Sequence, residues 1–415
     1  MSCRPRNIST LSYDIYNHIL LFLRPLPDYL NVAAVSKSFH DLVFSEDISS
    51  VIWCQDILII CIEPTTGFSR YVNTCPDYRV NPILAKKLFR SCKILELEMH
   101  CFMDQLESSI LDLSSKGTVT KLSIHLDRSR TGKVPFDVSL QINPRLFSAL
   151  KHLSVKPAVD AKTPPSQIIH LSGCKEFLSS LGLYLISLTI LGFTSTSGIF
   201  SVIQDTCPLL EELSIKVNDC KNISFDSPSL LSLYLCYRGI TLEGAHLNLP
   251  SLHTFSCMIH IESDYGLLQS ILAIPSQVKN LSVMGSAEYV NVMLLFISER
   301  FRALHSLDLK LFWVDTHDTD AVHISQHALS ALASKQAELN TLYLPFQYAA
   351  ADQSDTLQFS HFLKLERLGL WQHDDISLQC LAALLSKSPA LKAVYVRGFG
   401  PDDSKVDWAD LVTSG

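Results

Sequence analysis

One six-residue pattern of apolar and polar positions recurs through most of the chain, and a regular copy of it is LHSLDL at Leu304–Leu309. Apolar residues occupy its first, fourth and sixth positions, and its last three positions alternate between apolar and polar. Such alternation is typical of a short β-strand with one buried face. We call the fourth residue of each copy its marker, which is Leu307 in this copy.

Twelve copies of the pattern follow one another along the chain. Their markers are Leu95, Leu122, Leu153, Leu188, Leu213, Leu233, Phe255, Leu281, Leu307, Leu342, Leu368 and Val394. The spacing of adjacent markers centres on the period of leucine-rich repeats, roughly 20–29 residues. Parallel strands need a crossover of about a dozen residues, which is usually a helix. We therefore predict an α/β leucine-rich-repeat solenoid with a curved parallel β-sheet and convex helices.

The segments between the markers predict the crossovers. Helices are expected at Gln105–Leu113, Lys175–Leu181, Ile199–Thr206, Tyr289–Phe301, Gln326–Lys335 and Leu378–Ser386. The two shortest repeats, between Leu213 and Phe255, leave room only for extended or 3₁₀ crossovers. The longer repeats carry insertions that we expect to form loops on one face: Asp127–Asn143, Lys156–His170 and Trp313–His323.

The uncharged segment from Phe177 to Gln204 is long enough to cross a bilayer. It also contains three glycines, a run of Ser and Thr, and the copy LISLTI at Leu185–Ile190 in register with the other copies. A buried strand between two amphipathic helices explains this segment better than a membrane span does, so no membrane partner is predicted.

The N-terminal part follows a helical rather than a strand period. After a flexible arm at 1–10, Ile15, Ile19, Leu20 and Leu23 form one apolar stripe on a helix that the next prolines end. Two more short helices follow, with Asp28 and Ser36 as their expected N-caps. Three short helices make a very small core, so this unit, at 11–48, is expected to need a partner or the next domain. We assign 49–91 to a linker and N-terminal cap, 92–400 to the repeats and 401–415 to a tail.

The ordered residues of this helical unit resemble an F-box. Leu11, Asp14, Ile15, Ile19, Leu20 and Leu23 match the first part of that family's pattern, Pro25, Leu26, Asp28 and Leu30 its turn and second helix, and Val35, Lys37, Phe39 and Leu42 its last part. Three features depart from the pattern: Ser12 for the usual Pro, Ser36 for the usual Cys, and Arg24 as an extra residue. With the repeats that follow, the chain is similar to the F-box/leucine-rich-repeat proteins.

This resemblance implies a non-catalytic role. In that family the F-box binds the Skp adaptor of a cullin-RING ubiquitin ligase, and the repeats hold a protein substrate. The residues expected to face the adaptor are Leu11, Ile15, Ile19, Leu20, Leu23, Pro25, Leu26, Leu30, Val35 and Phe39. Two alternatives stay open: residues 11–43 could be only a helical cap of the repeats, and the chain could be a repeat scaffold or inhibitor without a ubiquitin role.

Composition narrows the function further. The chain of 415 residues is 47% hydrophobic and carries a net charge of −7, which allows a large core and argues against a nucleic-acid-binding protein. Its 12 cysteines include no C-x-x-C pair, so neither zinc nor a redox pair is predicted. The first ten residues contain no apolar core of a secretory signal, and we expect a cytoplasmic or nuclear location.

The sequence contains no motif that predicts catalysis or a cofactor. Gly-rich phosphate loops and the G-x-S-x-G nucleophile elbow are absent. The clearest cluster of possible metal ligands, His and Asp residues, is VDTHDTDAVHISQH at Val314–His327. The hypothesis of a hydrolase or metalloenzyme rests on this segment alone. Ser325 is the expected N-cap of the next helix, so His323 and His327 do not share a helix face. A hydrophilic insertion loop is the simpler interpretation.

The residues that alternate with the apolar strand positions should face outward. In the last four repeats they include several aromatic residues and an Arg, the types that dominate binding at protein interfaces. Ordinary strand propensity of Tyr and Trp is the alternative explanation. The candidates for substrate binding are Asp308, Lys310, Phe312, Trp313, Tyr343, Trp371, Tyr395 and Arg397.

Overall fold

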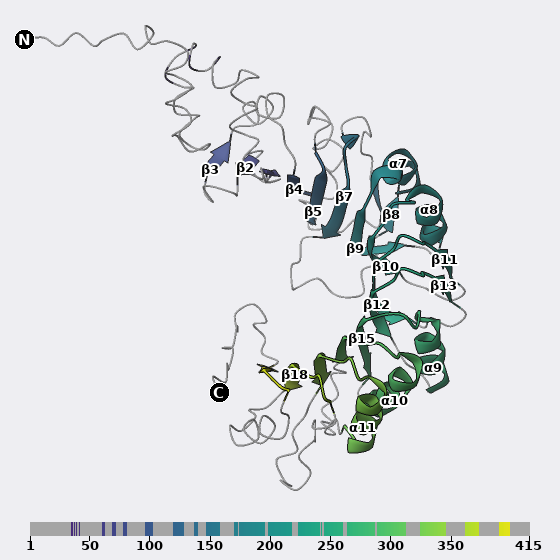
Figure 1. Cartoon of the computed structure of the whole chain (residues 1–415). Coiled ribbons are helices and arrows are strands. Elements are labelled where there is room, and N and C mark those ends of the chain that lie inside the picture. The colour runs from purple at the N-terminus through teal and green to yellow at the C-terminus, as the bar shows by residue number, and fades with distance from the viewer. Residues whose placement is uncertain are drawn as a thin grey trace, which may run out of the picture. The chain divides into compact units, whose positions relative to one another are not determined.

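Parallel strands, one in each repeat, are the main element of the computed structural model (Figure 1). The structure describes residues 35, 37, 39 and 41 and the ranges 60–62, 69–71, 78–80, 96–102, 119–127, 137–139, 147–157, 170–172, 174–195, 198–217, 223–240, 242, 245–259, 264–286, 289–312, 324–345, 362–372 and 390–398. The chain divides into two compact units, residues 1–194 and 195–415.

The first unit contains four parallel repeat strands. In sheet order they are β4 (Glu96–Phe102), β5 (Lys121–Asp127), β7 (His152–Pro157) and β9 (Ser187–Ser195). Helix α7 (Cys174–Leu181) and the 3₁₀ helix η4 (Gly182–Tyr184) lead into β9. Two short strands from the insertions, β6 (Asp137–Ser139) and β8 (His170–Ser172), pair in parallel. The region expected to be a linker contains a small antiparallel sheet that the sequence did not predict: β1 (Ile60–Ile62), β2 (Ser69–Tyr71) and β3 (Tyr78–Val80).

The second unit contains eight parallel repeat strands whose order in the sheet follows the chain. They are β10 (Glu212–Val217), β12 (Ser232–Ile240), β14 (Thr254–Ile259), β15 (Asn280–Ser286), β16 (Ser306–Phe312), β17 (Thr341–Pro345), β18 (Arg367–Gln372) and β19 (Ala393–Gly398). Its helices are α8 (Gly198–Thr206), α9 (Asp264–Ala273), α10 (Val290–Arg300) and α11 (Gln326–Lys335). Figure 1 shows α9, α10 and α11 in a row on one side of these strands.

The markers pair with one another from strand to strand. In the second unit the row runs through Leu213, Leu233, Phe255, Leu281, Leu307, Leu342, Leu368 and Val394. In the first unit Leu122, Leu153 and Leu188 pair in the same way. The first predicted marker was wrong, because Leu97, not Leu95, pairs with Leu122. Side chains in a strand repeat with period two, so a shift of two residues keeps the same face inward and the sequence could not separate the two leucines.

A repeated hydrogen bond fixes this register where each strand begins. The carbonyl of Lys279 accepts the N–H groups of His305 (2.7 Å) and Ser306 (3.1 Å) of the next repeat. The carbonyl of His305 in turn accepts those of Asn340 (3.0 Å) and Thr341 (3.1 Å). The same pair of hydrogen bonds links each repeat strand from β10 to β18 with the next one. The start of each strand is therefore positioned by the strand before it.

The core lies between the strands and the helices. Leu304, Leu307 and Leu309 are fully buried, as their places in the pattern predict. They face the side of the sheet that carries the helices, whose inner positions include the buried Leu294 and Leu332. The predicted helices at 175–181, 199–206, 289–301 and 326–335 are confirmed to within a residue at each end. The expected helices at 105–113 and 378–386 lie outside the described residues.

One helix was not predicted from the sequence. In α9, Ile271 is fully buried, whereas the adjacent Leu272 is 44% exposed. Apolar residues therefore lie on more than one side of this helix and give no clear one-sided period. The crossovers of the two shortest repeats contain no helix among their described residues. They contain two short strands that pair in parallel, β11 (Ser224–Asp226) and β13 (His246–Asn248). The prediction of extended crossovers is therefore confirmed.

The uncharged segment at 177–204 forms most of α7, then η4, β9 and most of α8. The interpretation as a strand between two helices is therefore confirmed. Within the described part of the chain, no helix has the length and hydrophobicity needed to span a membrane.

A buried glutamine links the repeats that carry α10 and α11. The Gln336 side chain is 2% exposed, and its Nε2 donates to the carbonyls of Ser298 and Phe301 at the end of α10. Its Oε1 accepts the Leu304 N–H at 3.2 Å. One amide thus satisfies backbone groups that helix and strand ends would otherwise leave unpaired in the core, and it fixes the approach to β16.

Replacing Leu307 with Ala should lower the free energy of unfolding by roughly 2–5 kcal/mol, because it leaves a cavity in the core. Chemical denaturation followed by far-UV circular dichroism measures this loss. Leu363→Ala is the matched control, because Leu363 is 81% exposed and its truncation should change stability by less than about 0.5 kcal/mol. Equal losses in the two variants would contradict the assignment of the marker row to the core.

Candidate functional site

The residue after each marker lies on the opposite side of the sheet from the core. Ser282, Asp308, Tyr343, Gly369 and Tyr395 hold this position in β15 to β19, and each pairs with the next. We call these five residues the outward row. Neighbouring strands lie about 4.8 Å apart, so the row brings together side chains from repeats distant in sequence.

Two tyrosines in the outward row lean toward each other. Tyr343 and Tyr395 lie two strands apart, a backbone separation of roughly 9.6 Å. Their ring centroids are nevertheless only 6.4 Å apart, with an interplanar angle of 29°. Tyr395 is 36% exposed and Tyr343 is half-buried. The pair is an aromatic surface of the kind that binds partners through stacking and apolar contact.

Gly369, between the two tyrosines, makes this arrangement possible. A Cβ atom at Gly369 would overlap the Tyr343 ring, coming within 2.8 Å of its Cγ and nearer still to Cδ1 and Cε1. The ring therefore occupies the space over β18 that a side chain at this position would fill. Glycine within a strand often marks such a close approach.

Asp308 lies in the outward row between Ser282 and Tyr343. Its Oδ2 accepts a hydrogen bond from Ser282 Oγ at 3.2 Å and lies 3.0 Å from Lys310 Nζ. Its Oδ1 is buried and has no hydrogen-bond partner among the described residues. Lys310 thus balances the charge of a partly buried carboxylate next to the tyrosine pair.

The environment of Tyr343 holds its hydroxyl in the neutral form. Burial raises the pKa of Tyr343, and Tyr395 and the Asp308 carboxylate raise it further. The Arg367 guanidinium acts in the opposite direction and lowers this pKa. At neutral pH the Tyr343 hydroxyl is therefore available as a hydrogen-bond donor.

Arg367 lies close enough to Tyr343 and Glu366 for its charge to lower the pKa of both groups. Its side chain is exposed, and it forms no ion pair with any residue that the structure describes. Its neighbour Glu366 accepts instead from Lys392 at 2.6 Å. Because Arg367 precedes Gly369 by two residues in the same strand, both lie on the outward side.

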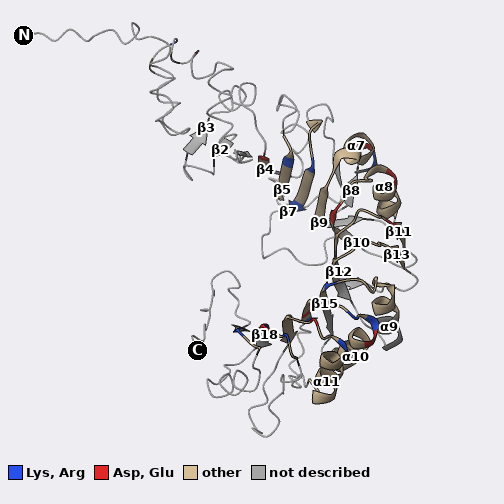
Figure 2. Ribbon diagram, in the orientation of Figure 1, with Lys and Arg blue, Asp and Glu red and all other residues tan. Residues whose placement is uncertain are grey.

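Several charges of the described repeats are paired between neighbouring repeats. Lys364 lies 2.7 Å from Glu338, and Lys121 lies 3.1 Å from Glu96. The pKa of Glu338 is lowered by its hydrogen bond from Lys364 and by that lysine's charge. In Figure 2, acidic and basic residues of the second unit are interspersed. The described residues therefore form no single-sign basic stripe of the kind that nucleic-acid-binding proteins carry.

The structure places several of the predicted substrate-binding residues together. Asp308, Tyr343 and Tyr395 share the outward row, and Lys310 contacts Asp308. The backbones of Trp371 and Arg397 pair in register, and Phe312 ends β16, but their side chains lie outside the described part. Trp313 also lies outside it. Sequence reasoning missed Gly369 and Arg367, although the glycine inside LERLGL is a signal for close approach within a strand.

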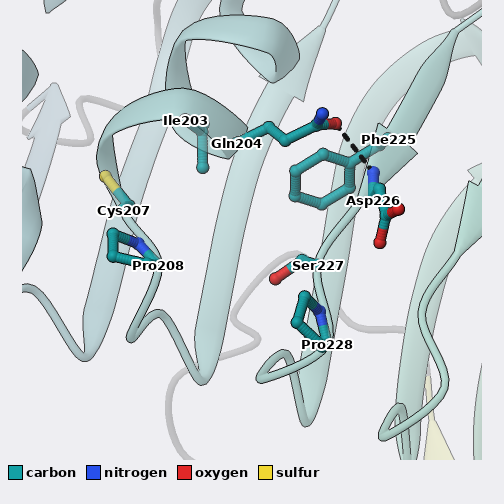
Figure 3. A pocket seen from close by; sticks show the side chains of 8 residues that line it. All are labelled: Ile203, Gln204, Cys207, Pro208, Phe225, Asp226, Ser227 and Pro228. Atoms are coloured by element: carbon teal, nitrogen blue, oxygen red, sulfur yellow. Dashed lines mark hydrogen bonds between the residues drawn. The ribbon is translucent and has the colours of Figure 1, made fainter.

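A pocket of about 340 Å³ lies on the helix side of the second unit (Figure 3). Its lining comes from α8, β11 and the turns after them: Ile203, Gln204, Cys207, Pro208, Phe225, Asp226, Ser227 and Pro228. Figure 3 shows Gln204 reaching across it to accept the Asp226 N–H at 2.9 Å. Burial raises the pKa of the Cys207 thiol, so it is a poor nucleophile at neutral pH.

A second pocket, of about 610 Å³, is lined by α9 and α10 residues and the turns after them. In it, Arg300 donates to the carbonyls of Leu272 (3.0 Å) and Ile274 (3.1 Å) at the end of α9. These bonds satisfy carbonyls that a helix end leaves free, which is a structural role.

Only the last residues of the histidine-rich segment Val314–His327 are described, from Ile324 on. Ser325 is the N-cap of α11, as predicted, because its Oγ accepts the Ala328 N–H at 3.2 Å. His327 is exposed on this helix, and residues 313–323 lie outside the described part. Among the residues that the structure describes, no three His, Cys, Asp or Glu side chains gather as metal ligands would.

Of the predicted adaptor-binding set, only Val35 and Phe39 are described. Both are helical, with Val35 69% exposed and Phe39 partly buried. The other eight residues of the set, from Leu11 to Leu30, lie outside the described residues.

No protein-family model matches this sequence, and neither does any curated protein. Among solved structures, one similar chain is the leucine-rich repeat-containing protein LegL7 from Legionella pneumophila. The two chains are 14% identical, and the match covers 75% of this chain and 87% of that chain with a TM-score of 0.33. The leucine-rich-repeat character of this chain therefore rests on its own strand register.

Gly369→Ala should displace the Tyr343 ring and separate it from Tyr395. The overlap should cost about 1–3 kcal/mol of unfolding free energy and weaken the tyrosine signal in near-UV circular dichroism. The matched control repeats Gly369→Ala in a Tyr343→Ala background, where the space is empty and the cost should vanish. The same cost in both backgrounds would show that the glycine is not needed for the ring.

The raised pKa of Tyr343 predicts a pH effect on stability. The folded chain holds this proton more tightly than the unfolded chain does, so unfolding free energy should fall as pH rises from about 10 to the folded pKa. Urea denaturation at a series of alkaline pH values measures the slope, which should be shallower in Tyr343→Phe. A slope that the substitution leaves unchanged would contradict the burial of this hydroxyl.

Proposed function

We propose that this chain is the substrate-recognition subunit of an SCF-type ubiquitin ligase. In this proposal residues 11–48 bind the Skp adaptor, and the outward face of the last repeats binds a protein substrate. The observation that carries the substrate-binding part is the outward row, where Gly369 lets Tyr343 and Tyr395 pair on an open strand face. The adaptor-binding part depends on the F-box-like order of residues from Leu11 to Leu42.

The chemistry expected of such a subunit is positioning. The chain would hold substrate lysines close to a ubiquitin-charged enzyme, which raises their effective concentration without any bond-making of its own. The open tyrosine pair suits binding of a protein surface, because aromatic residues supply much contact area at low entropic cost. The exposed, helical Val35 is suited to contact an adaptor groove, as apolar residues of docking helices do.

Co-purification of the full chain with the Skp adaptor tests the adaptor-binding part. The double variant Ile19→Asp with Leu23→Asp should lose capture by at least about tenfold, because charges do not enter an apolar groove. Val35→Asp should also weaken capture, and it changes a side chain that is 69% exposed, so folding should be unaffected.

The matched control replaces two exposed leucines of the repeats, Leu209→Asp with Leu363→Asp, and should capture the adaptor like the unchanged chain. Circular dichroism confirms that each variant is folded. Undiminished capture by the Ile19→Asp, Leu23→Asp chain, or no capture by the unchanged chain, would refute the ubiquitin-ligase role. The repeat scaffold or inhibitor would then be the better explanation.

A further inference from the structure

We infer that the outward row, together with Arg367, binds a polypeptide segment that carries an oxyanion near an apolar residue. This inference rests on the proposed substrate-binding role of the row. The oxyanion is the carboxylate of Asp or Glu or the phosphate of a phosphorylated residue, and its partner on this chain is Arg367. The apolar residue packs on the Tyr343–Tyr395 pair.

The charge balance around the row supports an anion. Its carboxylate, on Asp308, is already matched by Lys310 at 3.0 Å. Glu366, next to Arg367 in sequence, is matched by Lys392 at 2.6 Å. Arg367 also lowers the pKa of Glu366, but less than Lys392 does, and it forms no ion pair with a described residue. An exposed guanidinium binds carboxylate or phosphate through two parallel hydrogen bonds.

The spacing of the row defines the partner's pattern. Arg367 and Gly369, over which the Tyr343 ring lies, are two residues apart in β18, a distance of roughly 6.7 Å. An extended peptide places its residues i and i+2 on one face at about the same distance. We therefore expect an acidic or phosphorylated residue and an apolar or aromatic residue separated by one position.

The shape of the surface favours a polypeptide over a small molecule or a nucleic acid. Neither the α8–β11 pocket nor the α9–α10 pocket contains a residue of the outward row, so the ligand must lie across an open strand face. A nucleic acid would need several unpaired cations, whereas the charges described around the tyrosine pair are Arg367 and the Asp308–Lys310 ion pair.

Four peptide libraries test the inference on the full chain by fluorescence polarisation. Each has one fixed central residue, Glu, phosphoserine, Gln or Lys, flanked by randomised uncharged residues. The Glu library, the phosphoserine library or both should bind at least tenfold more tightly than the Gln library. Comparison of the Glu and phosphoserine libraries shows whether the chain prefers a carboxylate or a phosphate. Sequencing of the bound peptides should show apolar or aromatic residues two positions from the centre.

Arg367→Glu should abolish this preference and favour the Lys library, and the milder Arg367→Gln should equalise the Glu and Gln libraries. Arg302→Glu is the matched control, because Arg302 is an exposed arginine after α10 in the same unit, and it should bind like the unchanged chain. The inference would be overturned if the unchanged chain bound the Glu and phosphoserine libraries no better than the Gln library, preferred the Lys library, or bound no library. It would also be overturned if Arg302→Glu lost the oxyanion preference and Arg367→Glu kept it.

Adaptor capture by the Arg367→Glu chain keeps the two proposals apart. This variant should capture the adaptor like the unchanged chain. An unchanged chain that captures the adaptor but shows no oxyanion preference refutes the inference alone. A chain that selects oxyanion peptides but captures no adaptor refutes the ubiquitin-ligase role and leaves this binding site in place.

Discussion

The backbone hydrogen bonds at the start of each strand are the constraint on which the rest of the second unit depends. One carbonyl in each repeat, such as that of His305, accepts two N–H groups from the next repeat. This pairing aligns the markers on the core side, where Leu307 and Leu342 are fully buried. Since strand side chains alternate, the same register aligns Asp308 with Tyr343 on the other side. A slip by one residue would send the leucines outward, so burial of the core also fixes which residues form the outward row.

The close approach of the two tyrosines in the outward row depends on Gly369, which has no side chain. At most strand positions neighbouring tyrosines would be kept apart by the side chain between them. Gly369 leaves that space to the Tyr343 ring, which then approaches Tyr395 to 6.4 Å between centroids. The strand loses some intrinsic stability through this glycine. In β16 of the same sheet, Asp308 and Lys310 form an ion pair, whereas Arg367 forms none with a residue that the structure describes.

The sequence predicted what depends on periodicity. The buried leucines, four helices with their limits and the Ser325 cap follow from local rules, and the structure has them. It could not distinguish Leu95 from Leu97, because both suit a period of two. It missed α9, whose apolar residues lie on several sides. For the site, exposure and residue type pointed to Tyr343 and Tyr395, but the closeness of the rings over Gly369 depends on contacts between strands that no single repeat encodes.

The central claim is that the outward row of the last repeats, rather than the helix side, is the binding surface. Photo-crosslinking tests it most directly, with p-benzoylphenylalanine in place of Tyr395 in one chain and of the exposed Leu272 on α9 in another. Each full chain is irradiated with the glutamate-centred peptide library and the adducts are quantified by mass spectrometry. We predict adducts from position 395 and only background from position 272. Adducts that form from position 272 and not from position 395 would contradict the account.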